Sequence, residues 1–416
     1  MSTQLQRTLG LGDAVVIGLG SMIGAGVFAA WAPAAAAAGD GLIIGLAIAG
    51  LVALCNATSS AQLAAVYPES GGTYVYGRHQ LGEGWGHVAG WGFVVGKTAS
   101  CSAMALTVGA YLAPGQQRPV AVLAVVLITG INLGGLSRTV AVTKVLLVVS
   151  LTALAVVVAA GWSADGASLD AVDPGESDIG GILESAGLLF FAFAGYARIA
   201  TLGEEVRDPE RTIPRAIPAA LLGVLAVYAV VGLTALTAVS ATDLAATDAP
   251  LRVVVEAGGS WPAGLVRVGA AIASLGVLLN LIPGVSRTTL AMARNHELPG
   301  WLSHVDGKRA LPVRAELTVA AAVIGLILTL EVRDSIAVSG AAVLLYYAVT
   351  NAAAMTLEAD RRRFPLPFAI AGLVGCLVLI ASLPGAVLIG GGIVLAAGVV
   401  ARLAVRARPW GSPPRR

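Results

Sequence analysis

Long blocks of apolar residues constrain this chain more than any other feature of its sequence. Of its 416 residues, 57% are apolar and only 12% are charged. A soluble domain carries roughly 25% charged residues, so this chain has too little charge to cover the surface of a soluble protein. A helix needs about 20 apolar residues to cross the roughly 30 Å hydrocarbon core of a bilayer. Most of the blocks reach that length, and they predict membrane-spanning helices.

We predict an all-α integral membrane protein with about twelve spans. The blocks are much longer than the roughly 10 residues of a barrel strand and do not alternate polar with apolar residues. Helices also satisfy their own backbone groups, which lipid cannot do. The predicted spans cover residues 13–38, 41–66, 85–112, 119–135, 139–161, 180–203, 216–239, 262–288, 315–331, 334–356, 365–383 and 385–405.

The distribution of basic residues predicts the orientation, because cytoplasmic loops carry an excess of Lys and Arg. One set of loops holds most of them, and the opposite loops hold only Arg118, Arg252 and Arg333. The segment 1–12 and the tail 406–416 fall on the basic side, so both are expected in the cytoplasm. The basic set consists of Arg7, Arg78, Arg138, Arg207, Arg211, Arg215, Arg294, Lys308, Arg309, Arg314, Arg361, Arg362 and Arg363, with four more arginines in the tail.

Two of the predicted spans contain glycine where a helix is expected to be continuous. The first span reads GSMIGAGVF over Gly20–Phe28, and the sixth reads FAFAGYAR over Phe191–Arg198. Each interior Gly costs a helix about 1 kcal/mol relative to Ala. The two spans lie five apart, and matching interruptions in two halves point to a substrate site in transporters built from inverted repeats. Close helix packing through small residues is the alternative reading.

Four stretches resemble the amino acid–polyamine–organocation (APC) superfamily. They are GSMIGAGVF, YPESGGTYVYGRHQLG at Tyr67–Gly82, FFAFAGYARIATLGEEVRDPERTIPRAI at Phe190–Ile217, and SRTTLAMARNHELPGWL at Ser286–Leu302. The resemblance implies a leucine-transporter-type fold of five plus five helices. The repeats would cover 13–161 and 180–356, followed by two additional helices at 365–405. It further implies an amino acid or related amine as the substrate.

The same resemblance implies where the substrate binds. The interrupted first span would hold the substrate carboxylate, and carbonyl groups of the sixth span would hold its ammonium group. No acidic residue occurs at 191–197, which favours a neutral substrate. The implied site consists of Ser21, Met22, Ile23, Gly24, Ala25 and Gly26 from the first span, with Phe191, Ala192, Phe193, Ala194 and Tyr196 from the sixth.

Three basic residues, Lys97, Lys144 and Arg198, fall inside predicted spans, where ionisable groups are costly and often functional. In the resembling family, sodium-independent members place a lysine on the fifth helix where sodium-coupled relatives bind an ion. That implies proton coupling through Lys144, while snorkelling to the headgroups is the alternative. Lys97 and Arg198 receive no assigned role. A charged run is a candidate inner gate together with Arg78 or Arg294, unless that loop is simply solvated. The run consists of Glu204, Glu205, Arg207, Asp208 and Arg211.

Other classes of function find little support. The sequence contains no GxxxxGK[ST] motif, which would indicate ATP binding. Its net charge of +2 gives no argument for nucleic acid, and no cofactor or metal is expected. Cys55, Cys101 and Cys376 lie inside apolar blocks and are expected to pack there. The leading interpretation is a secondary transporter in the cell membrane that moves an amino acid, with the bilayer and a proton as its other partners. An obligate exchanger of amino acids or polyamines and a non-transporting sensor remain as alternatives, whereas an intramembrane enzyme is disfavoured.

Overall fold

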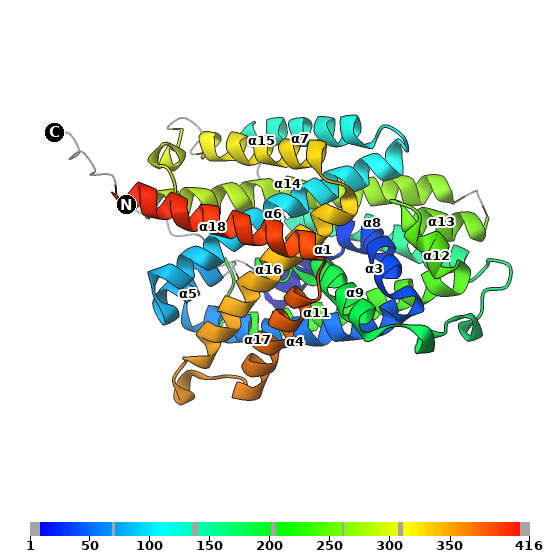
Figure 1. The fold of residues 1–416 in the computed structure, drawn as a ribbon, viewed down its shortest axis with the longest axis horizontal. Coiled ribbons are helices and arrows are strands. Elements are labelled where there is room, and N and C mark those ends of the chain that lie inside the picture. Colours follow the sequence, from blue (N-terminus) through cyan, green and yellow to red (C-terminus); the bar gives the residue numbers. More distant parts are fainter. Residues whose placement is uncertain are drawn as a thin grey trace.

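The computed structural model describes residues 9–68, 71–134, 140–200, 205–259, 262–306 and 311–407, and this part is helical (Figure 1). Apart from helices it contains two isolated bridges, Leu9–Val206 and Asp306–Leu311. The all-helical class is therefore confirmed for the described residues. The α-helices are α1 Leu11–Met22, α2 Ala25–Ala29, α3 Trp31–Ala38, α4 Leu42–Val66, α5 Thr73–Leu81, α6 Glu83–Leu112, α7 Gln117–Leu133, α8 Val140–Gly161, α9 Ile179–Phe193, α10 Ala197–Ala200, α11 Pro209–Ala238, α12 Ala241–Ala245, α13 Pro250–Ala257, α14 Ala263–Arg294, α15 Val313–Thr329, α16 Val332–Met355, α17 Leu366–Ala381 and α18 Gly385–Ala407. Short 3₁₀ turns are η1 Gly39–Gly41, η2 Leu169–Ala171, η3 Pro174–Glu176, η4 Gly300–Ser303 and η5 Ala359–Arg361.

Eight helical segments in the described part are long and apolar enough to cross a membrane. Three shorter apolar helices, α7, α9 and α17, add to them. Each predicted span overlaps at least one helix, but the count of twelve crossings and the division into two repeats stay predictions. The eight segments are 11–29, 31–66, 83–112, 142–161, 209–238, 263–294, 332–355 and 385–407.

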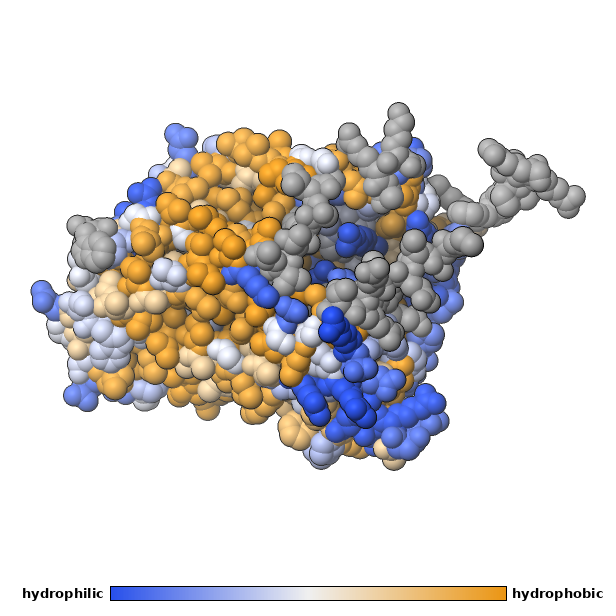
Figure 2. Space-filling view, turned by 180° about the vertical axis from the view of Figure 1, so that it is seen from behind, coloured by the Kyte–Doolittle hydropathy of each residue, from blue (hydrophilic) through white to orange (hydrophobic). Residues whose placement is uncertain are grey.

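The exterior of the bundle is broadly apolar, as Figure 2 shows for one face. Large apolar side chains such as Leu51, Val145 and Ile389 are more than 60% exposed. In water such exposure over a wide area would favour association, whereas a bilayer solvates it. Strongly hydrophilic residues gather instead mainly toward one side of the same view (Figure 2). These surfaces fit a protein that crosses the membrane several times.

Helix α6 forms the centre of the bundle. It is the most enclosed of the eight segments, with 89% of its most apolar window buried, compared with 11% for α18. Its most extensive packing partners are α16 and α14, and it also contacts α2 (Figure 1). A polar side chain in the middle of α6 is therefore enclosed by protein rather than by lipid.

Some sequence predictions fall wholly or partly outside the described residues. The N-terminal segment 1–12 is described only from Leu9, and the tail 406–416 only to Ala407, where α18 ends. The three cysteines are all buried, as the sequence predicts.

Candidate functional site

The first predicted span is interrupted within GSMIGAGVF. Helix α1 ends at Met22 and α2 begins at Ala25. At the interruption Ile23 has ψ 75° and Gly24 has φ −139° and ψ −146°. The Gly24 N–H donates to the Met22 carbonyl over 2.9 Å instead of to a carbonyl four residues earlier. The regular helix ladder is therefore broken near the middle of the span.

The sixth predicted span is interrupted within FAFAGYAR. Helix α9 ends at Phe193, and α10 begins at Ala197 after a turn of three residues. Within this turn the bonds run to carbonyls three residues back, from Ala194 to Phe191 over 3.3 Å and from Tyr196 to Phe193 over 3.5 Å. Carbonyl groups at the end of α9 therefore lack their usual helical donors.

The two interruptions contact each other. A Cβ atom added to Gly26 would lie only 2.7 Å from the Cα of Ala192, and one added to Gly195 would meet the Ser21 carbonyl. Gly24 approaches the side chain of Val277 in α14 in the same way. The residues that the sequence assigns to the two ends of a substrate therefore do come together.

Protein donors hold the carbonyl groups at this junction. The Tyr228 hydroxyl of α11 lies 2.6 Å from the Met22 carbonyl oxygen and 3.0 Å from that of Ala192. The Lys97 Nζ of α6 donates to the Ala194 carbonyl over 3.1 Å, and the Tyr347 hydroxyl of α16 lies 3.5 Å from the same oxygen. Polar groups from three helices thus converge on the carbonyls that would receive an ammonium group.

Aromatic rings enclose the junction. The rings of Tyr196 and Tyr347 stack with centroids 4.9 Å apart, and Phe193 lies 5.1 Å from Tyr228. Trp31 meets Tyr228 edge to face at 6.5 Å. Together they form an apolar wall around the polar backbone of the two interruptions, which is the usual composition of a small-molecule site.

The remaining predicted site residues whose side chains the structure describes are also buried or partly buried. Met22 and Ile23 are each 2% exposed, and Phe191 is 5% exposed. The Ser21 hydroxyl donates to the Ile17 carbonyl over 2.7 Å, so it is engaged within its own helix. The Ala25 side chain lies outside the described part.

Lys144 lies apart from the interruption. Its Nζ is 3.0 Å from Asp13 Oδ1 at the start of α1, and its side chain is 53% exposed. The adjacent Thr143 faces α1 at Gly20. Asp13 precedes Gly20 by seven residues, which is about 10 Å along a helix. In this state Lys144 is therefore bound to the entry of α1 and not to the carbonyls at its break.

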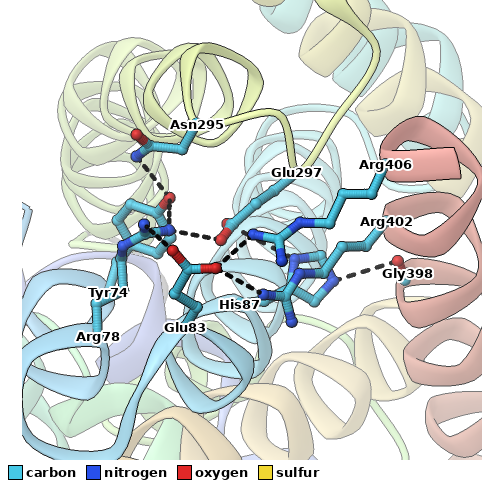
Figure 3. Close-up of polar contacts among 9 residues, drawn as sticks. All are labelled: Tyr74, Arg78, Glu83, His87, Asn295, Glu297, Gly398, Arg402 and Arg406. Carbon is cyan, nitrogen blue, oxygen red and sulfur yellow. Dashed lines mark hydrogen bonds and ion pairs between the residues drawn. The ribbon is translucent and has the colours of Figure 1, made fainter. Parts of the chain in front are cut away.

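A second polar cluster, the α18 cluster, joins α5, the start of α6, the segment after α14 and the end of α18 (Figure 3). Its centre is Glu297, which is fully buried and lies 2.6 Å from Arg78. The His87 Nδ1 is 3.7 Å from the other Glu297 oxygen. Sequence reasoning offered Glu204 and Glu205 as partners of Arg78. The structure pairs Arg78 with Glu297 and Glu83 instead, and Glu204 lies outside the described residues.

The α18 cluster fastens the last helix to α6. Glu83 pairs with Arg406 at 2.6 Å and with Arg402 at 3.7 Å. One turn further along α6, the His87 Nε2 lies 3.2 Å from the Gly398 carbonyl oxygen. Beside Arg78, burial and the Glu297 carboxylate raise the pKa of Tyr74 to about 12. Its hydroxyl therefore keeps its proton while it accepts a bond from Asn295 over 2.8 Å.

Sequence reasoning missed Tyr228, Tyr347 and Glu297. The two tyrosines lie inside apolar spans, where a buried hydroxyl needs a hydrogen-bond partner. That requirement could have marked them as candidates. Glu297 lies within SRTTLAMARNHELPGWL, a stretch the resemblance had already marked, but its burial could not be read from a loop sequence. Lys97 was marked by its charge alone, without its carbonyl partner.

Comparison with known proteins shows what this chain is similar to. A sequence model of the amino acid permease family matches residues 9–399. The chain is 54% identical over 405 residues to an uncharacterized transporter of Mycobacterium tuberculosis, covering 96% of this chain and 91% of that protein. It is 28% identical to a branched-chain amino acid permease of Bacillus subtilis, over 74% of this chain and 71% of that protein.

A cationic amino acid transporter of Arabidopsis thaliana is 27% identical, over 84% of this chain and 65% of that protein. The family model spans nearly the whole chain, and both the family and the names of the relatives point to a transporter and not to an enzyme. The chain therefore belongs to the amino acid permease family of the APC superfamily.

Proposed function

We propose that this protein is a secondary transporter that carries a small, neutral L-amino acid across the cytoplasmic membrane. The observation that carries the proposal is the contact between the two interrupted helices at Gly26 and Ala192, with Tyr228 bridging their carbonyl oxygens. Broken helices that meet inside the bundle supply both backbone N–H and carbonyl groups, which suit the two charged ends of an amino acid.

In this proposal the segment Ser21–Gly26 binds the substrate carboxylate through backbone N–H groups. The carbonyls of Phe191–Ala194 bind its ammonium group, and Tyr196 lies beside the side-chain pocket. The family and its relatives leave the side chain open, because their names include both branched-chain and cationic amino acids. The absence of acidic residues at 191–197 favours a neutral one.

The proposed architecture is twelve spans in two repeats of five, followed by α17 and α18, with both termini in the cytoplasm. Its support is the matching position of the two interruptions and the excess of basic residues on one set of loops.

We further propose that transport is coupled to protons through Lys144, in place of a sodium ion. Its ammonium group could alternate between Asp13, where it lies in this state at 3.0 Å, and the carbonyls at the break of α1. Burial on the second side would favour loss of the proton. The ion pair with Asp13 also favours a rival function, an obligate exchanger in which a fixed charge braces α1 against α8.

Uptake into proteoliposomes that contain only this chain tests these proposals. A labelled neutral amino acid should accumulate when the lumen is alkaline, without sodium. Lys144→Ala and Lys144→Arg should both lose accumulation driven by the pH gradient while they retain exchange, because arginine keeps the charge but cannot release a proton.

The arginine variant separates the two roles of Lys144. If Lys144→Arg accumulates substrate with the pH dependence of the wild type, the lysine only braces the helices and does not carry the coupled proton. Exchange by the wild type without any accumulation driven by a pH gradient would favour the exchanger. A requirement for sodium would make the proton mechanism wrong, and the absence of any uptake or exchange would favour a non-transporting sensor.

A further inference from the structure

Lys97 places a positive charge beside the junction of the two interrupted helices. It belongs to α6, the most enclosed of the candidate spans, and only 7% of it is exposed. Its Nζ lies 3.1 Å from the carbonyl oxygen of Ala194. Ala194 is one of the residues whose carbonyls we propose for the substrate ammonium, so this lysine already occupies part of that position.

The charge of Lys97 has no acidic partner in the part of the chain that the structure describes. None of the ion pairs within 4.0 Å there includes it. Its neighbours on α6 include Thr98, whose hydroxyl donates to the Val94 carbonyl, and Cys101. Since no carboxylate cancels the ammonium charge, that charge acts on whatever molecule enters the site.

We infer that Lys97 is a specificity-determining residue that excludes amino acids with a second positive charge. This inference rests on the proposed substrate site. Because Lys97 already binds the Ala194 carbonyl, the substrate ammonium group must bind another carbonyl, such as that of Ala192 two residues earlier. Amino acids with neutral or anionic side chains satisfy this condition, whereas arginine, lysine and polyamines add a further cation.

The size of the discrimination follows from the charges. Two unit charges about 7 Å apart, at an effective dielectric constant of about 20, repel each other strongly enough to weaken binding roughly fiftyfold. A long side chain can bend away from Lys97, so at least about a tenfold preference is expected. The chemical partner is therefore a zwitterionic or acidic amino acid.

The test compares pairs of ligands that differ in charge and little in size, namely arginine with citrulline and lysine with norleucine. Binding to the purified, full-length protein is measured by ligand-induced thermal stabilisation, which depends on concentration and dissociation constant. The wild type should bind the neutral member of each pair at least about tenfold more tightly.

Two uncharged variants, Lys97→Met and Lys97→Gln, should bring the ratio within each pair close to one. Lys97→Arg keeps the charge and should keep the preference. Thr98→Val is the matched control, because it removes a buried polar group one position along α6 and leaves the charge in place. Its ratio should equal that of the wild type.

Each outcome is decisive. Equal binding of the two members by the wild type overturns the role of Lys97 even if no variant folds. An unchanged ratio in both uncharged variants overturns it as well. Both results leave the transporter standing, whereas a wild type that binds no amino acid of any charge overturns the proposed function and this inference together.

Discussion

Gly26 leaves no room for a side chain where the two interrupted helices meet. A Cβ atom at this position would lie 2.7 Å from the Cα of Ala192 and 2.9 Å from its Cβ. Carbon atoms in contact prefer separations of about 3.5–4.0 Å. Gly26→Ala therefore forces α2 and α9 apart by roughly 1 Å, because backbone atoms, unlike a side chain, cannot rotate out of the way.

The expected cost is the difference between two effects. Overpacking of this kind costs about 1–3 kcal/mol, and replacing Gly by Ala within a helix returns up to about 1 kcal/mol. We expect Gly26→Ala to lose about 1–2 kcal/mol of stability in detergent. Substrate affinity should fall at least about tenfold, because both halves of the proposed site move apart.

Two further variants isolate the cause. Gly24→Ala meets a side chain, Val277, instead of backbone, so the double variant with Val277→Ala should recover stability and binding. Gly325→Ala is the control, since no atom lies within 4 Å of an added Cβ there, and its stability should be unchanged or slightly raised. Thermal unfolding with and without substrate measures all of them. Wild-type stability and affinity in Gly26→Ala would refute the close junction of α2 and α9.

Two other predictions concern the α18 cluster and the topology. Arg78→Met should destabilise the protein by about 3 kcal/mol or more, because it leaves the fully buried Glu297 without its cation. Glu297→Gln should cost less, since Arg78 is 24% exposed and also reaches Glu83; the reverse order in thermal unfolding would contradict this picture. Single cysteines at Ser2 and Ser412 should react with an impermeant reagent only after the membrane is opened, and labelling of either in sealed cells would reverse the orientation.

Much of the fold could be predicted from the sequence because membrane helices depend on a simple property, the length of an apolar block. The predicted span 85–112 corresponds to α6 at Glu83–Leu112 almost residue for residue. The interruptions could also be predicted, because four glycines cluster within the first span and Gly195 lies at the matching place in the sixth. GSMIGAGVF and FAFAGYAR both contain the breaks that the structure has.

Side-chain pairing could not be predicted in the same way, because it depends on how distant helices rotate against each other. Arg78 lies 219 positions before Glu297, and nothing local distinguishes this partner from the acids near 204. Likewise the charge of Lys97 was visible, but its bond to Ala194 spans 97 positions. The partner of Lys144 could not be predicted for the same reason, because α8 directs Lys144 toward Asp13 and the adjacent Thr143 toward Gly20.

The position of Tyr228 between two carbonyl groups has a consequence for how a ligand with an ammonium group would bind. A phenol has one proton to donate, yet Met22 and Ala192 both present an acceptor to it.

 The Met22 oxygen also accepts from the Gly24 N–H. When the hydroxyl proton points to Met22, the Ala192 oxygen on the other interrupted helix is therefore the one that goes without it. An arriving ammonium group brings three N–H donors and can supply the missing one, which frees the tyrosine to serve the other helix alone. The empty protein thus shares a single proton between two interrupted helices, and an ammonium group bound there would end that sharing.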